Sequence, residues 1–494
     1  MRRKLPIFYS ALLLTGVNLL LRFVSTSFQV YVSGKIGAAG VGLLQLVLSV
    51  GAMSVTLGMA GIRTASMYLC AGELGRRHPE NITRVLSACV LYSILCSGTI
   101  AAALYFGAPF LAAHWIGDLR TVAALRVYAS FLPITCITGV MTGYFTAANR
   151  IGTLAAVEVA EQLISMLLTM GILILWAGVD PAKACLGIVL GNGLSMCLTL
   201  TCLVVLRLRE RAGTGASIPL RNRLLETAVP LALADDLKAG ISTTENLMVP
   251  KRLALFQGID DPLAAFGMVC GMVFPVLMFP AAILYGLAEL LIPELARCAA
   301  AGSQQRISYL ARRSLRVAIF YGCLFGGLEF ILAETLCISL YNSTEAGKYL
   351  RLYALMIPML YTDAITDAMI KGLGEQKASV RYNILTSAMD VFFLFLLLPR
   401  YGMAGYYFSF LLTHLINFCL SLRRLIKIVG NIISIRTPVL SLISAAVALW
   451  VSMLCSNLFF SCVGYLTIFG CLLVLFRVWG KEDLYWLRGL TAKK

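Results

Sequence analysis

The sequence predicts an all-α polytopic membrane protein with 14 transmembrane helices, arranged as two six-helix lobes plus a C-terminal helix pair. Of its 494 residues, 59% are hydrophobic and only 13% are charged, whereas soluble domains carry about 25% charged residues. The mean hydropathy is +0.85. Apolar runs of the roughly 20 residues that cross a bilayer recur along the whole chain. This composition argues against a soluble enzyme, a disulfide-rich secreted fold and a disordered chain.

Seven predicted spans lie in each half of the chain. The cores expected in the first half are 7–32, 40–70, 83–107, 121–145, 153–177, 182–206 and 224–249. Those expected in the second half are 263–292, 309–333, 349–372, 379–399, 403–426, 437–458 and 460–479. The connections between them are short, so no segment is large enough for a soluble catalytic domain.

The basic residues predict how the chain is oriented. With the N-terminus in the cytoplasm, 29 of the 41 Lys and Arg residues fall in cytoplasmic segments, nine in outer segments and three inside spans. Cytoplasmic loops of membrane proteins are enriched in Lys and Arg. We therefore expect a multi-pass membrane protein with both termini in the cytoplasm. The formal charge of +17 then needs no nucleic-acid partner.

Metal and nucleophilic chemistry have no visible basis in the sequence. The 15 cysteines form no C-x-x-C pair, and the three histidines are far apart. Metal sites need clustered ligands, so we expect no metal and no catalytic residues, and we interpret the cysteines as small hydrophobes.

A weak internal repeat indicates the lobes. A shift of 217 residues places Asn18 on Asp235 and Ser25 on Ser242, so the first span meets the seventh. Such repeats help to locate transporter binding sites. We predict an N-terminal lobe over 1–212, a C-terminal lobe over 213–430 and an extra helix pair with a basic tail over 431–494.

Polar stripes on these two related spans are the candidate substrate site. The first span carries one polar face, made by Asn18, Arg22, Ser25 and Gln29. On the seventh, one face carries Asp235, Lys238, Ser242 and Glu245, and Asp236 lies beside it. A charge at mid-bilayer costs about 2.5–3.5 kcal/mol on insertion scales, so these groups must face protein or water.

Each embedded charge also has a purely structural interpretation. Lys238 could pair with Asp235, and Arg22 with a carboxylate on another helix. Arg63 could reach the cytoplasmic interface by snorkelling. Asp390 is a coupling candidate because no basic residue lies within a turn of it. Packing or coupling roles are open for further acidic residues, namely Glu158, Glu161, Glu289, Glu329, Glu334, Asp363 and Asp367.

Three segments carry a resemblance to a known family. They are Asn18–Val24 (NLLLRFV), Val32–Gln45 (VSGKIGAAGVGLLQ) and Lys371–Lys377 (KGLGEQK). The chain resembles polysaccharide flippases of the multidrug/oligosaccharidyl-lipid/polysaccharide exporter superfamily, in the stage V sporulation protein B-like branch, which is related to bacterial lipid II flippases. The resemblance implies a central cavity that opens alternately to each side, and an undecaprenyl-diphosphate-linked sugar as cargo.

The sequence thus predicts a transporter that flips a lipid-linked sugar or peptidoglycan precursor, for spore cortex or cell-wall synthesis. It is expected to be no enzyme, to act as a monomer among membrane lipids and to hold no cofactor, with coupling to H⁺, Na⁺ or the membrane potential. One alternative is a cation-coupled multidrug antiporter, against which Arg22 and Lys238 count. Another is a membrane-embedded glycosyl- or acyltransferase, which would need a base or nucleophile on a sizeable loop.

Overall fold

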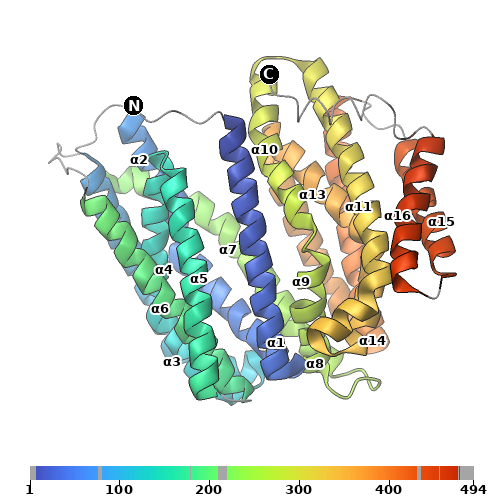
Figure 1. The fold of residues 1–494 in the computed structure, drawn as a ribbon. Coiled ribbons are helices and arrows are strands. Elements are labelled where there is room, and N and C mark those ends of the chain that lie inside the picture. The colour runs from blue at the N-terminus through green and yellow to red at the C-terminus, as the bar shows by residue number, and fades with distance from the viewer. Residues whose placement is uncertain are drawn as a thin grey trace. The chain divides into compact units, whose positions relative to one another are not determined.

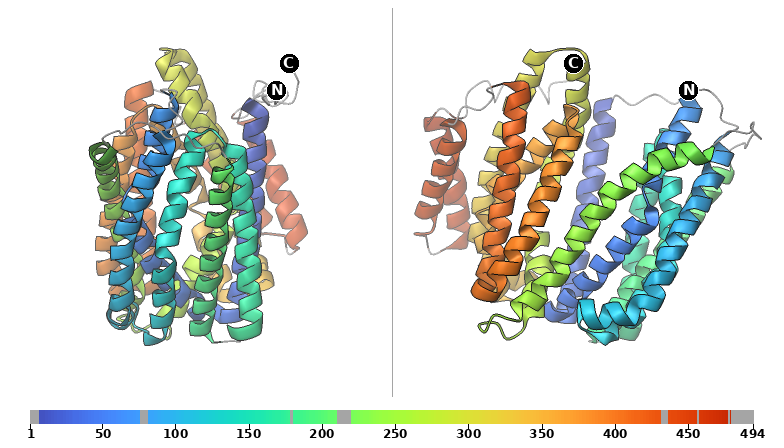
Figure 2. Two further views of the ribbon diagram at one scale, coloured as in Figure 1. Left: turned by 90° about the vertical axis from the view of Figure 1, so that its left-hand side faces the viewer. Right: turned by 180° about the vertical axis from the view of Figure 1, so that it is seen from behind.

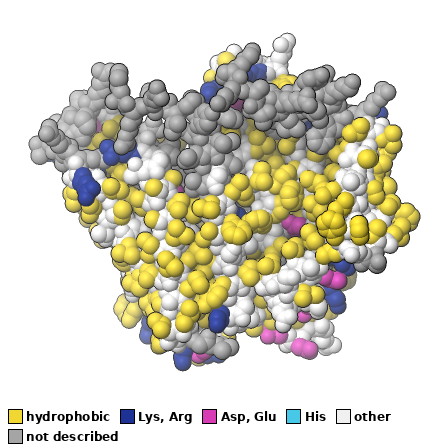
Figure 3. Space-filling model, viewed as in Figure 1, with side chains coloured by type: hydrophobic (Ala, Val, Ile, Leu, Met, Phe, Trp, Pro, Cys, Tyr) yellow, Lys and Arg dark blue, Asp and Glu magenta, His cyan; other side chains and the backbone are white. Residues whose placement is uncertain are grey.

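Helices make up all the regular secondary structure that the computed structural model describes, over residues 7–75, 81–177, 180–209, 220–430, 436–455, 457–476 and 478 (Figure 1). Eight helices in these ranges are each long and apolar enough to cross a membrane, and a bent pair makes a ninth. On the face shown in Figure 3, hydrophobic side chains form a broad band over the helices. Large apolar side chains such as Phe106 and Leu175 are 80% and 87% exposed, which suits a lipid surround.

The two longest helices each contain two spans. Helix α1 (Ile7–Met59) has 53 residues and α14 (Gln376–Val429) has 54. At 1.5 Å per residue each would be about 80 Å long, far more than the roughly 30 Å of a hydrocarbon core. Gly37 (φ 67°, ψ 177°) interrupts α1, and Gly402 (φ 55°, ψ −134°) interrupts α14. Glycine reaches these backbone angles without a Cβ clash.

Contacts among the described residues divide the chain into two compact units. The first comprises Met1–Thr26, Met272–Asp390 and Tyr406–Lys494, and the second Ser27–Gly271 and Val391–Gly405. We call these the C-unit and the N-unit. Helix α1 is divided between them, with the part up to Thr26 in the C-unit and the part from Ser27 in the N-unit. The N-unit also holds α2 (Ile62–Gly75), α3 (Ile82–Phe110), the π-helix η2 (Leu111–Ile116), η3 (Leu119–Thr121), α4 (Val122–Ala147), α5 (Ile151–Ile172), η4 (Leu173–Ala177), α6 (Pro181–Leu208), α7 (Leu220–Leu253) and α8 (Pro262–Met268).

The C-unit is built mainly from the second half of the chain. It holds α9 (Phe274–Leu277), α10 (Ala281–Ala300), α11 (Gln304–Tyr341), α12 (Thr344–Ala354), α13 (Ile357–Gly372), most of α14, α15 (Arg436–Ser452) and α16 (Leu458–Leu475); the π-helix η5 (Val269–Val273) crosses the unit boundary. The pair α15 and α16 stands side by side (Figure 2) and shares a core with α11. Within that core the Tyr465 hydroxyl donates to the Cys323 carbonyl at 2.7 Å.

The predicted count of 14 spans is confirmed in the described ranges. It is reached when α1 and α14 count twice, and when each helix that follows a break is joined to the one before it.

The contact units do not follow the predicted repeat, because α7 groups with the spans before it. The Thr243 hydroxyl donates to the Ser49 carbonyl at 3.2 Å, and the Asn246 amide to the Ser49 hydroxyl at 3.0 Å. The lobes at 1–212, 213–430 and 431–494 stay a prediction.

Three of the spans that hydropathy delimits as single apolar runs contain a break. In the second span α1 ends at Met59, and Ala60 (φ 42°) and Gly61 (φ 69°) separate it from α2. The eighth bends by 65° between α8–α9 and α10, at Met278–Pro280. The tenth breaks between α12 and α13, whose second residue is Pro358. Proline cannot donate the helical hydrogen bond, so it favours such breaks.

Neighbouring tyrosines donate hydrogen bonds to backbone carbonyls at the eighth-span break. The Tyr361 hydroxyl donates to the Leu277 carbonyl at 2.9 Å, and the Tyr321 hydroxyl donates to the Pro280 carbonyl at 2.7 Å. Irregular backbone at membrane depth is stable only with such partners. The bend is therefore a built feature that α11 and α13 hold in place.

We predict that Gly61→Ala destabilises the protein. A Cβ on Gly61 would lie 2.4 Å from the Ala228 carbonyl oxygen of α7, at a φ of 69°. The left-handed backbone and the overpacking together should lower the free energy of unfolding by about 2–4 kcal/mol. Chemical or thermal unfolding of the detergent-solubilised protein measures this. Gly72→Ala is the matched control, because nothing lies within 4 Å of its Cβ position; equal loss in both variants would contradict the prediction.

Candidate functional site

Arg22 sits at the middle of the first span. It is 15 residues from Ile7 and 15 from Gly37, the ends of the first segment of α1, and its side chain is half-buried. No carboxylate pairs with it among the described residues. Its electrostatic neighbour is Tyr285 on α10, which also interacts with Asp363 on α13. The structural alternative for Arg22, an ion pair with another helix, is therefore not what the described residues show.

The other members of the first-span stripe differ from one another. The side chain of Asn18 lies outside the described residues. Ser25 is half-buried and engaged in an interaction within the fold. Gln29 donates its amide to the Gly271 carbonyl of η5 at 3.1 Å. Gln29 thus already has a hydrogen-bond partner within the fold. The guanidinium of Arg22 pairs with no described carboxylate and keeps donors for a ligand.

On α7 the predicted stripe lies on the face turned away from the N-unit core. Asp235, Lys238 and Ser242 are exposed, and Glu245 is half-buried with an interaction of its own. Lys238 forms no ion pair with Asp235 in the described structure. The opposite face buries Ala232, Thr243 and Leu247. Three of the four predicted stripe residues are therefore exposed on α7, and their role at a substrate site stays a prediction.

Asp236 points to a different neighbourhood from the stripe. It is half-buried, and one of its carboxyl oxygens is buried without a hydrogen-bond partner among the described residues. Its electrostatic neighbour is Tyr92 on α3, whose hydroxyl donates to the Ala60 carbonyl at 3.3 Å. Asp236 therefore lies beside the break of the second span.

Arg63 lies just after the same break. The sequence placed it toward the cytoplasmic end of one continuous helix, but it occupies the first turn of α2, 12 residues before the end at Gly75, and is exposed. The helix thus continues for about 18 Å beyond Arg63. The snorkelling interpretation of Arg63 stays a prediction.

Three buried carboxylates lie inside the C-unit. Asp390 is 5% exposed and accepts from the Ser409 hydroxyl at 2.5 Å and the Thr413 hydroxyl at 3.3 Å. Asp363 is 9% exposed and accepts from the Asn417 amide at 3.0 Å. Glu329 is 5% exposed, with both oxygens unpaired in the described structure.

The pairing of Asp363 with Asn417 is the feature that sequence reasoning missed. The two residues are 54 positions apart, on α13 and on α14, and no spacing rule connects them. One oxygen of Asp363 and the oxygen of Asn417 are buried and lack partners in the described structure, so the pair could accept a further cation or proton. No cluster of three metal-ligating side chains occurs in the ranges that the structure covers.

Comparison with known families identifies the first third of the chain. Residues 14–177 match the MatE family. Arg22, Gln29 and Arg63 lie within the matched residues. Over 400 residues the chain is 22% identical to stage V sporulation protein B of Bacillus subtilis (strain 168), covering 79% of this chain and 77% of the relative. The resemblance predicted from the sequence is confirmed.

Solved structures resemble this chain well beyond residues 14–177. An inward-facing multidrug resistance MATE family transporter of the MOP superfamily matches with a TM-score of 0.69 and 13% identity, over 85% of this chain and 98% of that one. The lipid II flippase MurJ in an inward closed conformation matches with a TM-score of 0.68 and 12% identity, over 97% and 100%. The chain is a multi-pass membrane protein, and its fold is similar to the folds of these two proteins.

We predict that the α7 stripe is accessible from water. In a background without native cysteines, single cysteines at positions 235, 238 and 242 should react with a polar thiol reagent. Cysteines at 243 and 247 should stay unreactive, because Thr243 and Leu247 are buried. Labelling in membranes with a charged maleimide measures the difference. Equal labelling on both faces, or labelling on neither, would refute an aqueous wall at α7.

Proposed function

We propose that the protein is a flippase for an undecaprenyl-diphosphate-linked sugar or peptidoglycan precursor. It works by alternating access in a bacterial cytoplasmic membrane, as a monomer with both termini in the cytoplasm. The observation that carries this proposal is Arg22, a mid-span guanidinium that no described carboxylate neutralises. The similarity of the chain to stage V sporulation protein B supports a role in spore cortex or wall synthesis.

The charge of the cargo explains why an unpaired arginine is needed. A diphosphate brings at least two negative charges, and removing them from water is unfavourable without positive partners. Arg22 presents a planar fork of donors that binds phosphate oxygens bidentately. Lys238 and Arg63 are exposed and add further positive charge along the N-unit. The lipid tail stays in the bilayer while Arg22 receives the head group.

A cation-coupled multidrug antiporter is the second candidate, because one similar structure is a multidrug transporter. Such a protein needs an accessible acidic site for its cationic substrate. Here Asp363, Asp390 and Glu329 are at most 9% exposed, and two of them already accept hydrogen bonds. Arg22 and Lys238 are more accessible than these acids. Asp235 on α7 is exposed as well, so the preference for an anionic cargo rests on Arg22, which no described carboxylate neutralises.

A membrane-embedded transferase is the third candidate. It would need an available base near the outer face, where His114 is the natural choice. Its ring stacks on Phe110 at 4.6 Å, and Nδ1 lies 3.2 Å from the Phe110 carbonyl oxygen. This contact engages only Nδ1 and leaves Nε2 of an exposed ring available, so the preference for transport over transferase chemistry rests on the likeness to solved transporters.

Coupling belongs to the buried carboxylates of the C-unit. Asp363 and Asn417 leave two oxygens without partners, so H⁺ or Na⁺ could bind between them. Tyr285 lies in the electrostatic range of both Asp363 and Arg22. Neutralising Asp363 would therefore change the field at Arg22 within the same unit, which gives a route from ion binding to release of an anionic head group.

Arg22→Ala should lower the rate of flipping by more than tenfold, since losing one partner of a desolvated charge pair costs about 2–5 kcal/mol. Arg22→Lys should recover only part, because bidentate geometry is lost. Proteoliposomes that contain a fluorescent lipid-linked oligosaccharide or precursor measure the rate, and a cationic drug serves as the competing substrate.

The matched control is Arg120→Ala, which removes an exposed arginine paired with Asp118 at 2.7 Å. All variants are compared at equal membrane abundance. Normal flipping by Arg22→Ala would assign Arg22 a structural role, and faster transport of the drug than of the lipid-linked sugar would favour the antiporter.

Asp363→Asn should separate transport from its driving ion. The amide keeps a hydrogen-bonding group beside Asn417 but cannot bind a proton or hold a cation. We expect the stimulation of flipping by an imposed H⁺ or Na⁺ gradient to fall by about tenfold or more, the effect of removing one charged ligand. The rate of flipping without a gradient should persist. Asp118→Asn, on an outer connection, is the control. Full stimulation in Asp363→Asn would place the coupling site elsewhere.

A further inference from the structure

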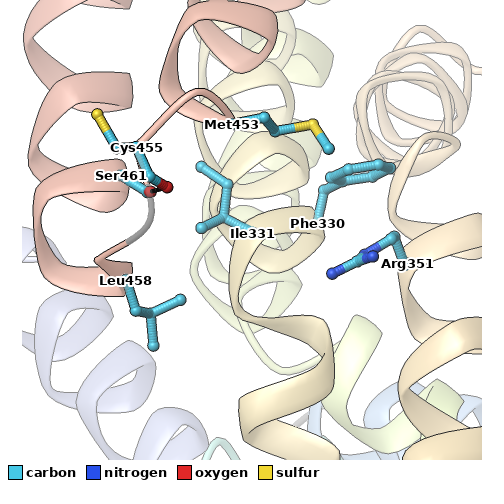
Figure 4. Close-up of a pocket in the computed structure, with 7 residues that line it drawn as sticks. All are labelled: Phe330, Ile331, Arg351, Met453, Cys455, Leu458 and Ser461. Carbon is cyan, nitrogen blue, oxygen red and sulfur yellow. Dashed lines mark hydrogen bonds between the residues drawn. The ribbon is translucent and has the colours of Figure 1, made fainter.

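A small pocket opens where the end of α11 meets α12 and the α15–α16 turn (Figure 4). Its volume is about 210 Å³, and it is lined by Phe330, Ile331, Arg351, Met453, Cys455, Leu458 and Ser461. All these residues belong to the C-unit. The lining is apolar except for the Arg351 guanidinium at one side and the Ser461 hydroxyl at the other (Figure 4). Drug-sized ligands need roughly 300–1,000 Å³, so only part of a larger molecule fits.

Arg351 is held at this pocket by close packing of two helices. A Cβ on Gly347, one turn before Arg351, would lie 2.9 Å from the Glu334 Cα of α11. This close approach brings the guanidinium carbon of Arg351 to 5.5 Å from the centre of the Phe330 ring. The glycine therefore fixes a cation beside the apolar lining.

The guanidinium has more donors than the fold uses. Its one described ion pair joins Nη1 to the Glu334 carboxylate at 3.3 Å, and the Arg351 and Glu334 side chains are 37% and 48% exposed. The Nε atom is buried and has no hydrogen-bond partner in the described structure. An arginine carries five N–H donors, and a buried donor without an acceptor is unfavourable. Among the described residues, Nε of Arg351 therefore lacks an acceptor.

We propose that this pocket binds an anionic glycerophospholipid. Its phosphate would accept from the Arg351 guanidinium, and the first part of one acyl chain would lie along Phe330, Met453 and Leu458. The site is separate from the flipping pathway and does not depend on the proposed cargo.

The surface around the pocket suits a lipid rather than a soluble anion. At the α15–α16 turn, Leu454 and Phe459 are 72% and 69% exposed, as apolar side chains facing acyl chains are. The turn connects the thirteenth and fourteenth spans, on the side expected to be extracytoplasmic. The long side chain of an arginine near such a turn can extend toward the head groups and bind a phosphate there without taking its charge into the hydrocarbon core.

Three variants of the full-length protein test the site. Native mass spectrometry in detergent would count bound phosphatidylglycerol and phosphatidylcholine, at equal lipid concentrations. Arg351→Ala should lower phosphatidylglycerol occupancy by about tenfold, as expected for one lost charge-assisted contact. Glu334→Gln should raise it, because the competing carboxylate charge is gone. Arg120→Ala, which removes an arginine from a different Arg–carboxylate pair, should leave it unchanged.

The double variant Arg351→Ala/Glu334→Gln guards against misfolding, since it leaves no unpaired carboxylate. It should bind phosphatidylglycerol as weakly as Arg351→Ala. Unchanged phosphatidylglycerol occupancy in Arg351→Ala and the double variant would overturn the proposal. So would equal retention of phosphatidylcholine, or Arg351-dependent binding of undecaprenyl phosphate in place of phosphatidylglycerol. Flipping rates play no part in these readouts, so this site and the proposed function can fail independently.

Discussion

The absence of water from the hydrocarbon core governs this structure more than any single contact does. Each backbone N–H and C=O at that depth needs a partner inside the protein, and a helix supplies nearly all of them. Where the eighth span breaks, the Tyr321 hydroxyl donates to the Pro280 carbonyl and the Tyr361 hydroxyl donates to the Leu277 carbonyl. Backbone irregularity is thus confined to places where neighbouring helices complete the hydrogen bonding.

The same constraint sorts the charged side chains. Those deepest in the C-unit are carboxylates, and two of them have hydroxyl or amide donors, as Asp390 has from Ser409 and Thr413. Arg22 has no described carboxylate, although a mid-bilayer charge is unfavourable by about 2.5–3.5 kcal/mol. A function must offset this unfavourable free energy of the Arg22 charge, and the function we propose is the binding of an anionic head group.

Breaks and charges also coincide in the N-unit. The backbone of the second span leaves the helix at Ala60–Gly61, where Gly61 packs against the α7 backbone and Tyr92 donates to Ala60. Arg63 and Asp236 lie on either side of this point. Packing without a side chain at Gly61 is therefore what brings charged groups of two distant spans to one place.

The sequence by itself determined the helical class, the 14 spans and the polar face of α7, because hydropathy and helical period are local properties of the chain. It also indicated Arg22, since a lone arginine in an apolar run is visible without a structure. Only the tertiary structure decided that Asp363 meets Asn417 across 54 residues, that α7 packs on the first spans, and that Arg351 closes a pocket with α16. These depend on which helices become neighbours, and in a chain whose apolar faces are nearly all alike, that choice rests on close glycine contacts and single hydrogen bonds that no periodicity records.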